Sequence, residues 1–135
     1  MALPEGFEPL FRTSPFLDLI GPIFNKRVNK DITIAFLAEE KHCNARGIVH
    51  GGMFSSLADI ALGYNTAFSG EKPIPMVTVS LSVDYMGSAK LGDWIEITSN
   101  VEKIGGSMAF ASCRFCVDGK MVAKASAVFK IVSKS

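Results

Sequence analysis

The stretch that decides the fold runs from His42 to Phe68 and reads HCNARGIVHGGMFSSLADIALGYNTAF. It begins as a polar loop, passes through a double glycine after a histidine, and continues as one long predicted helix. Apolar side chains occur on almost every side of this helix, which is typical of a buried helix. Its middle nevertheless carries Asp59, and a buried charge without a partner is strongly unfavourable. Asp59 is therefore either a functional group or a buried carboxylate bonded to a nearby Ser or Thr.

The start of the helix suggests a binding site for an oxygen atom. The first backbone N–H groups of a helix have no partner within it and lie at the positive end of its dipole. Gly51 and Gly52 leave this place free of side chains, which is the arrangement of an oxyanion hole, although two glycines can also simply allow a tight turn. The Asn44 amide could donate to the same place or cap the loop. His50 could contact a substrate or position the loop.

The spacing of Gly51 and Asp59 constrains how the two could work together. Eight residues of helix correspond to roughly 12 Å along the axis, whereas a general base must lie within about 3 Å of the proton that it takes, or one water away. Asp59 therefore cannot serve a carbonyl group that is held at the start of its own helix. If the site is real, we expect it to lie between two subunits.

The remainder of the chain predicts strands around this helix. Ser14-Pro15 begins a short helix that ends at Gly21, and Lys30 lies in the turn of the first hairpin. Asp118-Gly119 is typical of a type I′ hairpin turn. From Val77 to Tyr85 the residues alternate, so that Val77, Val79, Leu81, Val83 and Tyr85 share one face and Thr78, Ser80, Ser82 and Asp84 the other. The expected strands are 23–28, 32–37, 77–85, 94–101, 108–117 and 121–132.

These elements predict an α+β fold with one curved antiparallel sheet of about six strands. We expect the sheet to wrap around the single long helix. In the sequence, this helix lies between the second and third strands. Ala123, Ala125 and Ala127 on one face of the last strand would allow the helix to lie close to the sheet. The length of 135 residues predicts a single domain, residues 1–135.

Composition excludes several classes of function. The net charge is +1, from 14 basic and 13 acidic residues, which does not favour nucleic acid as a partner. Cys113 and Cys116 would point to opposite faces of a strand, so we expect free thiols rather than a metal or redox pair. The N-terminus lacks the pattern of a secretory signal, and no apolar stretch approaches the roughly 20 residues of a membrane span. We therefore expect a soluble cytoplasmic protein.

The central motif resembles a known family. Asn44-x-x-Gly47-x-x-His50-Gly51-Gly52 is followed by Leu57-Ala58-Asp59 and, downstream, by Tyr85-Met86 and Ala89-Lys90-Leu91-Gly92-Asp93. This combination resembles the hotdog-fold acyl-CoA thioesterases of the phenylacetate-pathway (PaaI-like) type, over nearly the whole chain after about residue 12. The resemblance implies dimers that join their sheets, and often dimers of dimers.

The resemblance also implies roles for individual residues. Gly51 matches the backbone N–H that polarises the thioester carbonyl, and Asn44 matches an assisting donor. Asp59 matches the carboxylate, from the opposite subunit, that activates water or attacks the carbonyl itself, and Thr78 a hydroxyl that helps to hold the water. The turn at Gly105, Gly106 and Ser107 matches the binding place for the nucleotide end of coenzyme A, and His50 and Gly52 are further expected substrate contacts.

The expected reaction is hydrolysis of an acyl- or aryl-acyl-CoA, with no metal and no cofactor. Two alternatives remain open at this stage: a hydratase or dehydratase that acts on acyl thioesters, and a non-catalytic acyl-CoA-binding protein of the same fold. The acyl group itself is not determined. Phe16, Phe24, Phe54, Tyr64 and Phe68 could each line an acyl pocket or pack in the core.

Overall fold

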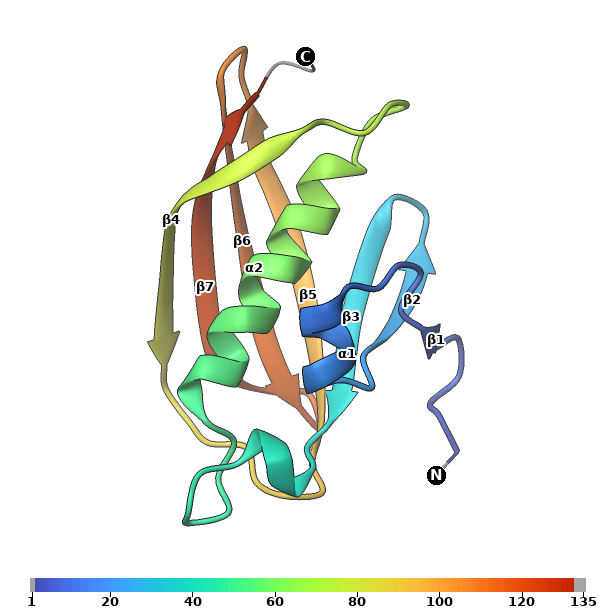
Figure 1. The fold of residues 1–135 in the computed structure, drawn as a ribbon, viewed down its shortest axis with the longest axis vertical. Helices are drawn as coiled ribbons and strands as arrows, with labels where there is room; N and C mark the ends of the chain where they lie inside the picture. The colour runs from blue at the N-terminus through green and yellow to red at the C-terminus, as the bar shows by residue number, and fades with distance from the viewer. Residues whose placement is uncertain (1, 133–135) are drawn as a thin grey trace.

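The computed structural model describes residues 2–132. Within them, one antiparallel sheet curves around one long helix (Figure 1). The strand order across the sheet is β1-β2-β3-β5-β6-β7-β4, so that β1 and β4 form the two edges. The elements are β1 (Glu8–Pro9), α1 (Pro15–Ile20), β2 (Phe24–Val28), β3 (Asp31–Leu37), a 3₁₀ turn η1 (Glu40–His42), α2 (Gly51–Ala67), β4 (Met76–Tyr85), β5 (Trp94–Ile104), β6 (Met108–Val117) and β7 (Lys120–Ile131).

The predicted hairpins are confirmed in position and turn chemistry. Asp118 and Gly119 both have positive φ angles, 50° and 78°, as a type I′ turn requires, and they connect β6 to β7. Asn29, with φ 58°, turns the chain between β2 and β3. Ser14 caps α1 by accepting a hydrogen bond from the Leu17 N–H. Local sequence therefore determines these turns and this cap.

The core lies between the concave face of the sheet and one face of α2. The alanines of β7 are buried, as their spacing predicts, and allow the helix to approach the sheet. The buried helix residues are Met53, Phe54, Leu57, Ala58, Ala61, Leu62, Asn65 and Thr66.

Three expectations about the elements differ from the structure. The sheet has seven strands rather than about six, because the short β1 pairs with β2, and β5 continues to Ile104 rather than ending at Val101. The long helix is not buried all round, because Asp59, Ile60 and Tyr64 lie on a half-buried face that the sheet leaves uncovered.

A β-bulge in β4 overturns the predicted alternation of that strand. Thr78 pairs with Phe129 and Ser80 with Val128, so Val79 is an extra residue without a partner on β7. Phe129 faces the core, and residues paired across two strands share a face, so Thr78 also faces the helix. Leu81, Val83 and Tyr85 lie on this same face. Regular alternation had assigned Thr78 to the opposite face, because a bulge reverses the pattern and has no clear signature in the sequence.

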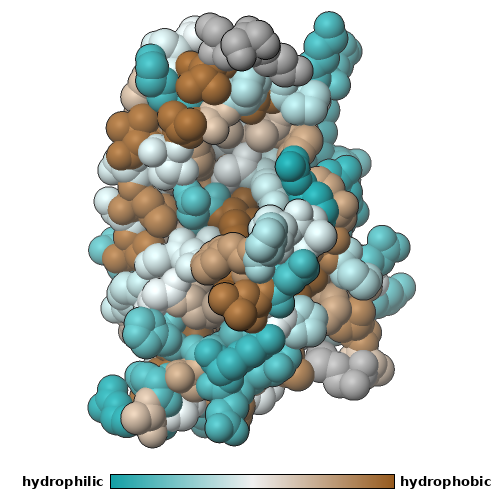
Figure 2. Space-filling view, viewed as in Figure 1, coloured by the Kyte–Doolittle hydropathy of each residue, from teal (hydrophilic) through white to brown (hydrophobic). Residues whose placement is uncertain are grey.

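Strand β4 leaves an apolar edge open. It pairs only with β7, at the end of the sheet order. Val77 and Val79 are 52% and 57% exposed, and Tyr85 and Met86 at its far end are about half exposed as well. Figure 2 shows apolar surface along the side of the molecule where Figure 1 places β4.

Candidate active site

The loop before α2 presents the helix start as an open donor site. His50 is the N-cap, and its Nδ1 accepts a hydrogen bond from the Gly52 N–H at 2.8 Å. The next N–H, that of Met53, bonds to the His50 carbonyl. Within residues 2–132 no acceptor takes the N–H of Gly51. Of the two glycines predicted to contact a substrate, Gly51 therefore has an available N–H, whereas the N–H of Gly52 is engaged by His50.

Tyr85 packs closely against Gly51. Its hydroxyl donates to the Gly51 carbonyl at 2.7 Å and lies 3.0 Å from the Ser55 hydroxyl. A Cβ at position 51 would lie 3.2 Å from Tyr85 Cζ and from its hydroxyl oxygen, which is tighter than nine in ten Cβ contacts, so Tyr85 would have to shift slightly. Tyr85 thus fixes the helix start against the end of β4. Sequence reasoning assigned Tyr85 no role, although Tyr85 lies in the motif that carries the family resemblance and ends the alternating stretch.

The side-chain oxygen of Asn44 stabilises the turn of the loop before α2. Its Oδ1 accepts from the N–H groups of Arg46 at 2.9 Å and Ile48 at 3.3 Å, which is the ordinary turn-forming use of Asn. No acceptor among the described residues takes its Nδ2 hydrogens. The loop is fixed on its other side by buried His42, whose Nδ1 accepts from the Glu39 N–H and whose Nε2 bonds to the Ile20 carbonyl. Asn44 can therefore cap the loop and still donate.

Asp59 and Thr78 form the second part of the site. The Thr78 hydroxyl donates to Asp59 Oδ1 at 2.6 Å. Among the described residues, nothing donates to the other carboxylate oxygen. Both residues line a cavity of about 460 Å³, whose other walls are mostly apolar side chains of α2, β4 and the segment between them. The pair thus offers an oriented carboxylate at the edge of an apolar pocket.

The predicted site residues lie in three separate places in this chain. Asn44, His50 and Gly51 lie at the start of α2, and Asp59 lies two turns further on, roughly 12 Å along the axis. The turn at 105–107 lies at the opposite end of the sheet from the helix start (Figure 1), because it adjoins the Met76 end of β4 rather than the Tyr85 end. One protomer therefore does not bring the donor group and the carboxylate group together.

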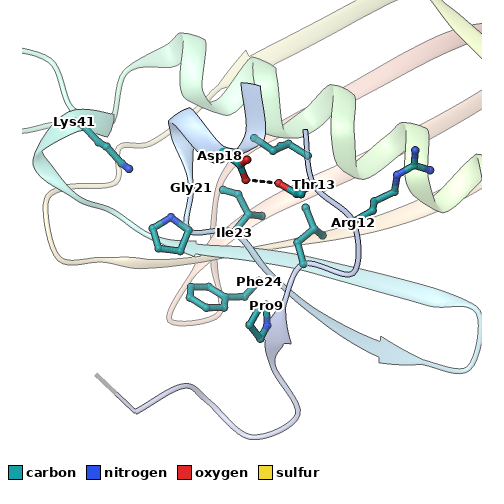
Figure 3. Close-up of a pocket in the computed structure, with 11 residues that line it drawn as sticks. Pro9, Arg12, Thr13, Asp18, Gly21, Ile23, Phe24 and Lys41 are labelled. Atoms are coloured by element: carbon teal, nitrogen blue, oxygen red, sulfur yellow. Dashed lines mark hydrogen bonds between the residues drawn. The ribbon is translucent and has the colours of Figure 1, made fainter. Parts of the chain in front are cut away.

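A second hollow, of about 500 Å³, lies between α1, β2 and the segment before α1 (Figure 3). Its polar contact is the hydrogen bond from Thr13 to Asp18, and it contains none of the predicted site residues. Of the aromatic residues proposed for an acyl pocket, Phe24 lines this hollow. Tyr64 and Phe68 line the Asp59 cavity. Phe54 packs in the core, and Phe16 is half exposed.

Burial also changes the pKa of titratable side chains that are not among the predicted site residues. Burial raises the pKa of the Cys113 thiol to about 12, and burial also raises the pKa of Tyr64. Cys43, Cys113 and Cys116 are free thiols. Within residues 2–132 there is no cluster of three potential metal ligands and no helix long and apolar enough to cross a membrane.

Comparison with known proteins identifies the family. Residues 46–124 match the family described as Thioesterase superfamily. The chain is 51% identical over 132 residues to the Pseudomonas aeruginosa protein named "Putative esterase PA0474", covering 97% of this chain and 98% of the relative. It is 38% identical over 88 residues to human acyl-coenzyme A thioesterase 13, covering 64% of this chain and 62% of the human protein.

A solved structure has the same fold. The chain superposes on a variant of the phenylacetic acid degradation protein PaaI from Thermus thermophilus with a TM-score of 0.78 and 22% identity, covering 88% of this chain and all of that one. Together with the sheet wrapped around α2, these matches confirm the hotdog fold and the PaaI-like resemblance. The chain belongs to the thioesterase superfamily and is a thioester hydrolase.

Proposed function

We propose that this protein hydrolyses acyl-CoA thioesters at a site that two protomers share. The observation that carries the proposal is the Thr78–Asp59 hydrogen bond at the apolar cavity, combined with an available Gly51 N–H about 12 Å away on the same helix. Because the helix holds these groups apart, a second copy of the chain must supply the missing half of each site.

In the proposed mechanism, the thioester carbonyl oxygen accepts hydrogen bonds from the Gly51 N–H and the Asn44 amide of one protomer. Such donors stabilise the negative charge that develops on this oxygen. Asp59 of the other protomer has one of two roles. It is either the base that takes a proton from the water that attacks the carbonyl carbon, or the nucleophile that attacks this carbon itself. In the first case the water oxygen bonds to the carbon, the carbon–sulfur bond breaks, and coenzyme A leaves as the thiolate.

Thr78 has a defined task in the water-activation form of this mechanism. Its hydrogen is committed to Asp59 Oδ1, so its oxygen can accept a hydrogen from the water while Asp59 Oδ2 accepts the other. A water held in this way directs a lone pair away from both residues. This chemistry uses no metal and no cofactor.

The open edge of β4 supports a homodimer. An edge strand of ten residues with exposed apolar side chains and an unpaired outer edge is a ready place for pairing with another chain. Thr78 and Tyr85 lie near the two ends of this strand and contact Asp59 and Gly51 respectively. Antiparallel pairing of two β4 strands would bring the Thr78 end of one protomer to the Tyr85 end of the other. Dimers could pair further, and the 105–107 turn could then hold the nucleotide end of coenzyme A beside Asp59 of its own protomer.

The test is thiol release from a panel of acyl-CoAs, from acetyl to long-chain, phenylacetyl and hydroxybenzoyl, with wild-type protein and Asp59→Asn. We expect Asp59→Asn to lower kcat about 10²- to 10⁴-fold, the usual contribution of a general base. Asp84→Asn is the matched control, because Asp84 is exposed on the outer face of β4. We expect this substitution to leave kcat unchanged.

The outcomes separate the three candidate functions. Binding of acyl-CoA without thiol release by the wild-type protein would favour a non-catalytic binder. Consumption of an unsaturated acyl-CoA without thiol release would favour a hydratase. Near-normal hydrolysis by Asp59→Asn would contradict the proposed mechanism.

A further inference from the structure

Arg12 is an exposed positive charge at the wall of the mostly apolar Asp59 cavity, and the proposed reaction does not use it. The Asp59 cavity is lined by Arg12 as well as by Tyr64 and Phe68. The Arg12 guanidinium carbon lies 5.6 Å from the Tyr64 ring centre and 5.7 Å from that of Phe68. In Figure 3 its side chain extends toward α2, and Arg12 also lines the hollow beside α1.

The segment that carries Arg12 is held in place on both sides. The Leu10 N–H bonds to the Ile23 carbonyl, and the Phe11 N–H bonds to the side chain of buried Asn25 at 2.8 Å. The Phe11 ring contacts the rings of Tyr64 and Phe68 edge-on, with centroids 5.3 and 5.5 Å apart. The position of Arg12 therefore follows from packing of the N-terminal segment on α2.

The guanidinium retains its hydrogen-bonding capacity. Its contacts with the two rings are cation–π contacts, which use no N–H donor toward an oxygen. In the part of the chain that the structure describes, no carboxylate lies within 4.0 Å of it. A guanidinium presents a fork of N–H groups that matches a carboxylate with two parallel hydrogen bonds.

The position of Arg12 along the cavity determines which part of a substrate could reach it. Tyr64 and Phe68 lie five and nine residues beyond Asp59, which is roughly 8 to 14 Å along the helix axis. A thioester carbonyl beside Asp59 would thus place the far end of a medium-length acyl chain near the guanidinium. The apolar walls between them suit methylene groups or a ring.

We propose that Arg12 is a specificity residue that selects acyl groups ending in a carboxylate, so that the preferred substrates are medium-length dicarboxylic mono-CoA thioesters. This inference rests on the proposed thioesterase function and deepens it. Apolar walls bind the body of the chain, Asp59 and Thr78 act at one end, and Arg12 pairs with the carboxylate at the other.

The experiment compares suberyl-CoA with octanoyl-CoA, whose acyl chains are equal in length and differ in the terminal carboxylate. We expect Arg12→Leu to lower kcat/KM for suberyl-CoA about 10- to 100-fold, the usual value of a hydrogen bond to a charged group, and to leave octanoyl-CoA hydrolysis within about threefold. Arg12→Lys keeps the charge without the fork and should retain part of the preference.

Arg27→Leu is the matched control. The Arg27 guanidinium lies 4.5 Å from the Phe11 ring centre but does not line the Asp59 cavity. The Arg27→Leu substitution removes the same charge from the same aromatic cluster. It should leave kcat/KM for both substrates unchanged. Circular dichroism of each variant checks that the N-terminal segment still folds.

The other outcomes overturn the inference in distinguishable ways. Equal losses on both substrates would mean that Arg12 contacts the coenzyme A phosphates or supports the fold, and no change would mean that it only packs on the rings. Hydrolysis of octanoyl-CoA but not suberyl-CoA by the wild-type protein would also overturn it. If the wild-type protein hydrolyses nothing in the panel, the thioesterase proposal fails. Calorimetric binding of the same two thioesters to wild type and Arg12→Leu then decides the role of Arg12.

Discussion

The Thr78 hydroxyl donates a 2.6 Å hydrogen bond to Asp59 Oδ1 because a bulge at Val79 turns Thr78 toward the helix. In a regular strand Thr78 would share the outer face with Ser80, Ser82 and Asp84, and Asp59 would lose its partner. The proposed catalytic pair thus depends on one extra residue in an edge strand.

Deletion of Val79 should therefore impair catalysis. Without the bulge residue, Thr78 would turn to the outer face, and we expect kcat to fall about 10- to 100-fold, as for loss of a hydrogen bond to a charged group. Thr78→Val should give a similar loss. Val79→Ala keeps the bulge and serves as the control. Full activity in the deletion variant would show that the register of β4 does not control the site.

Substitutions at Gly51 should separate its N–H from its lack of a side chain. Pro is well tolerated at the first position of a helix but has no N–H. We expect Gly51→Pro to lower kcat about 10²- to 10³-fold, the usual cost of losing one oxyanion-hole donor. Gly51→Ala introduces the same close contact with Tyr85 but keeps the donor, so it should lose much less. Equal losses in the two variants would indicate that crowding, rather than the donor, is responsible.

Mixed dimers should reveal whether the site is shared. Asp59→Asn and Gly51→Pro protomers should each form inactive homodimers. When the two are co-expressed, half of the dimers are mixed, and each mixed dimer has one site with both groups intact. We expect recovery of about a quarter of the wild-type activity. No recovery in purified mixed dimers would place Gly51 and Asp59 in a site within one chain, and a stable wild-type monomer in size-exclusion chromatography would contradict a shared site.

Asn65 should contribute strongly to stability. It is 4% exposed and makes three hydrogen bonds, with the Ile32 N–H and carbonyl and with the Ala61 carbonyl. Asn65→Leu would leave buried backbone groups of Ile32 without these partners, so we expect a loss of roughly 2 to 4 kcal/mol in urea unfolding at fixed protein concentration. Asn100→Leu, at an exposed position, is the control and should change stability little. Equal losses of stability in the two variants would mean that the hydrogen bonds between Asn65 on α2 and Ile32 on β3 contribute little.

The buried Cys113 thiol should make stability fall at alkaline pH. Burial raises its pKa from 9.0 to about 12 in the folded protein. Below about pH 9 the thiol is neutral in both states and has no pH-dependent effect. Between pH 9 and 12 the unfolded chain loses the proton while the folded chain keeps it, which lowers stability by at most about 1.4 kcal/mol per pH unit.

Urea unfolding at pH 8 to 10.5 measures this effect. Cys113→Ala should show a shallower decline than the wild type, because it lacks the titrating group. The native protein should also be labelled by a thiol reagent more slowly at Cys113 than at the half-buried Cys43 and Cys116. Parallel declines in both proteins would place the alkaline sensitivity elsewhere.

Local chemistry explains why much of the fold could be predicted. The Asp118-Gly119 turn, the Ser14 cap and the buried alanines of β7 each depend on neighbouring residues or on a period of two. The position of the long helix and the spacing between Gly51 and Asp59 likewise follow from the residue order. The sequence by itself thus determined the hairpins, the central helix and the separation of the two groups along it.

Only the tertiary structure decided how these pieces meet. The bulge at Val79 has no local signal, yet it turns Thr78 toward Asp59. Tyr85 reaches Gly51 from 34 residues away, and Arg12 reaches Tyr64 and Phe68 because the N-terminal segment packs on α2. The physical reason is the same in each case: hydrogen bonds and ring contacts between distant segments depend on strand register and packing, which no short window of sequence contains.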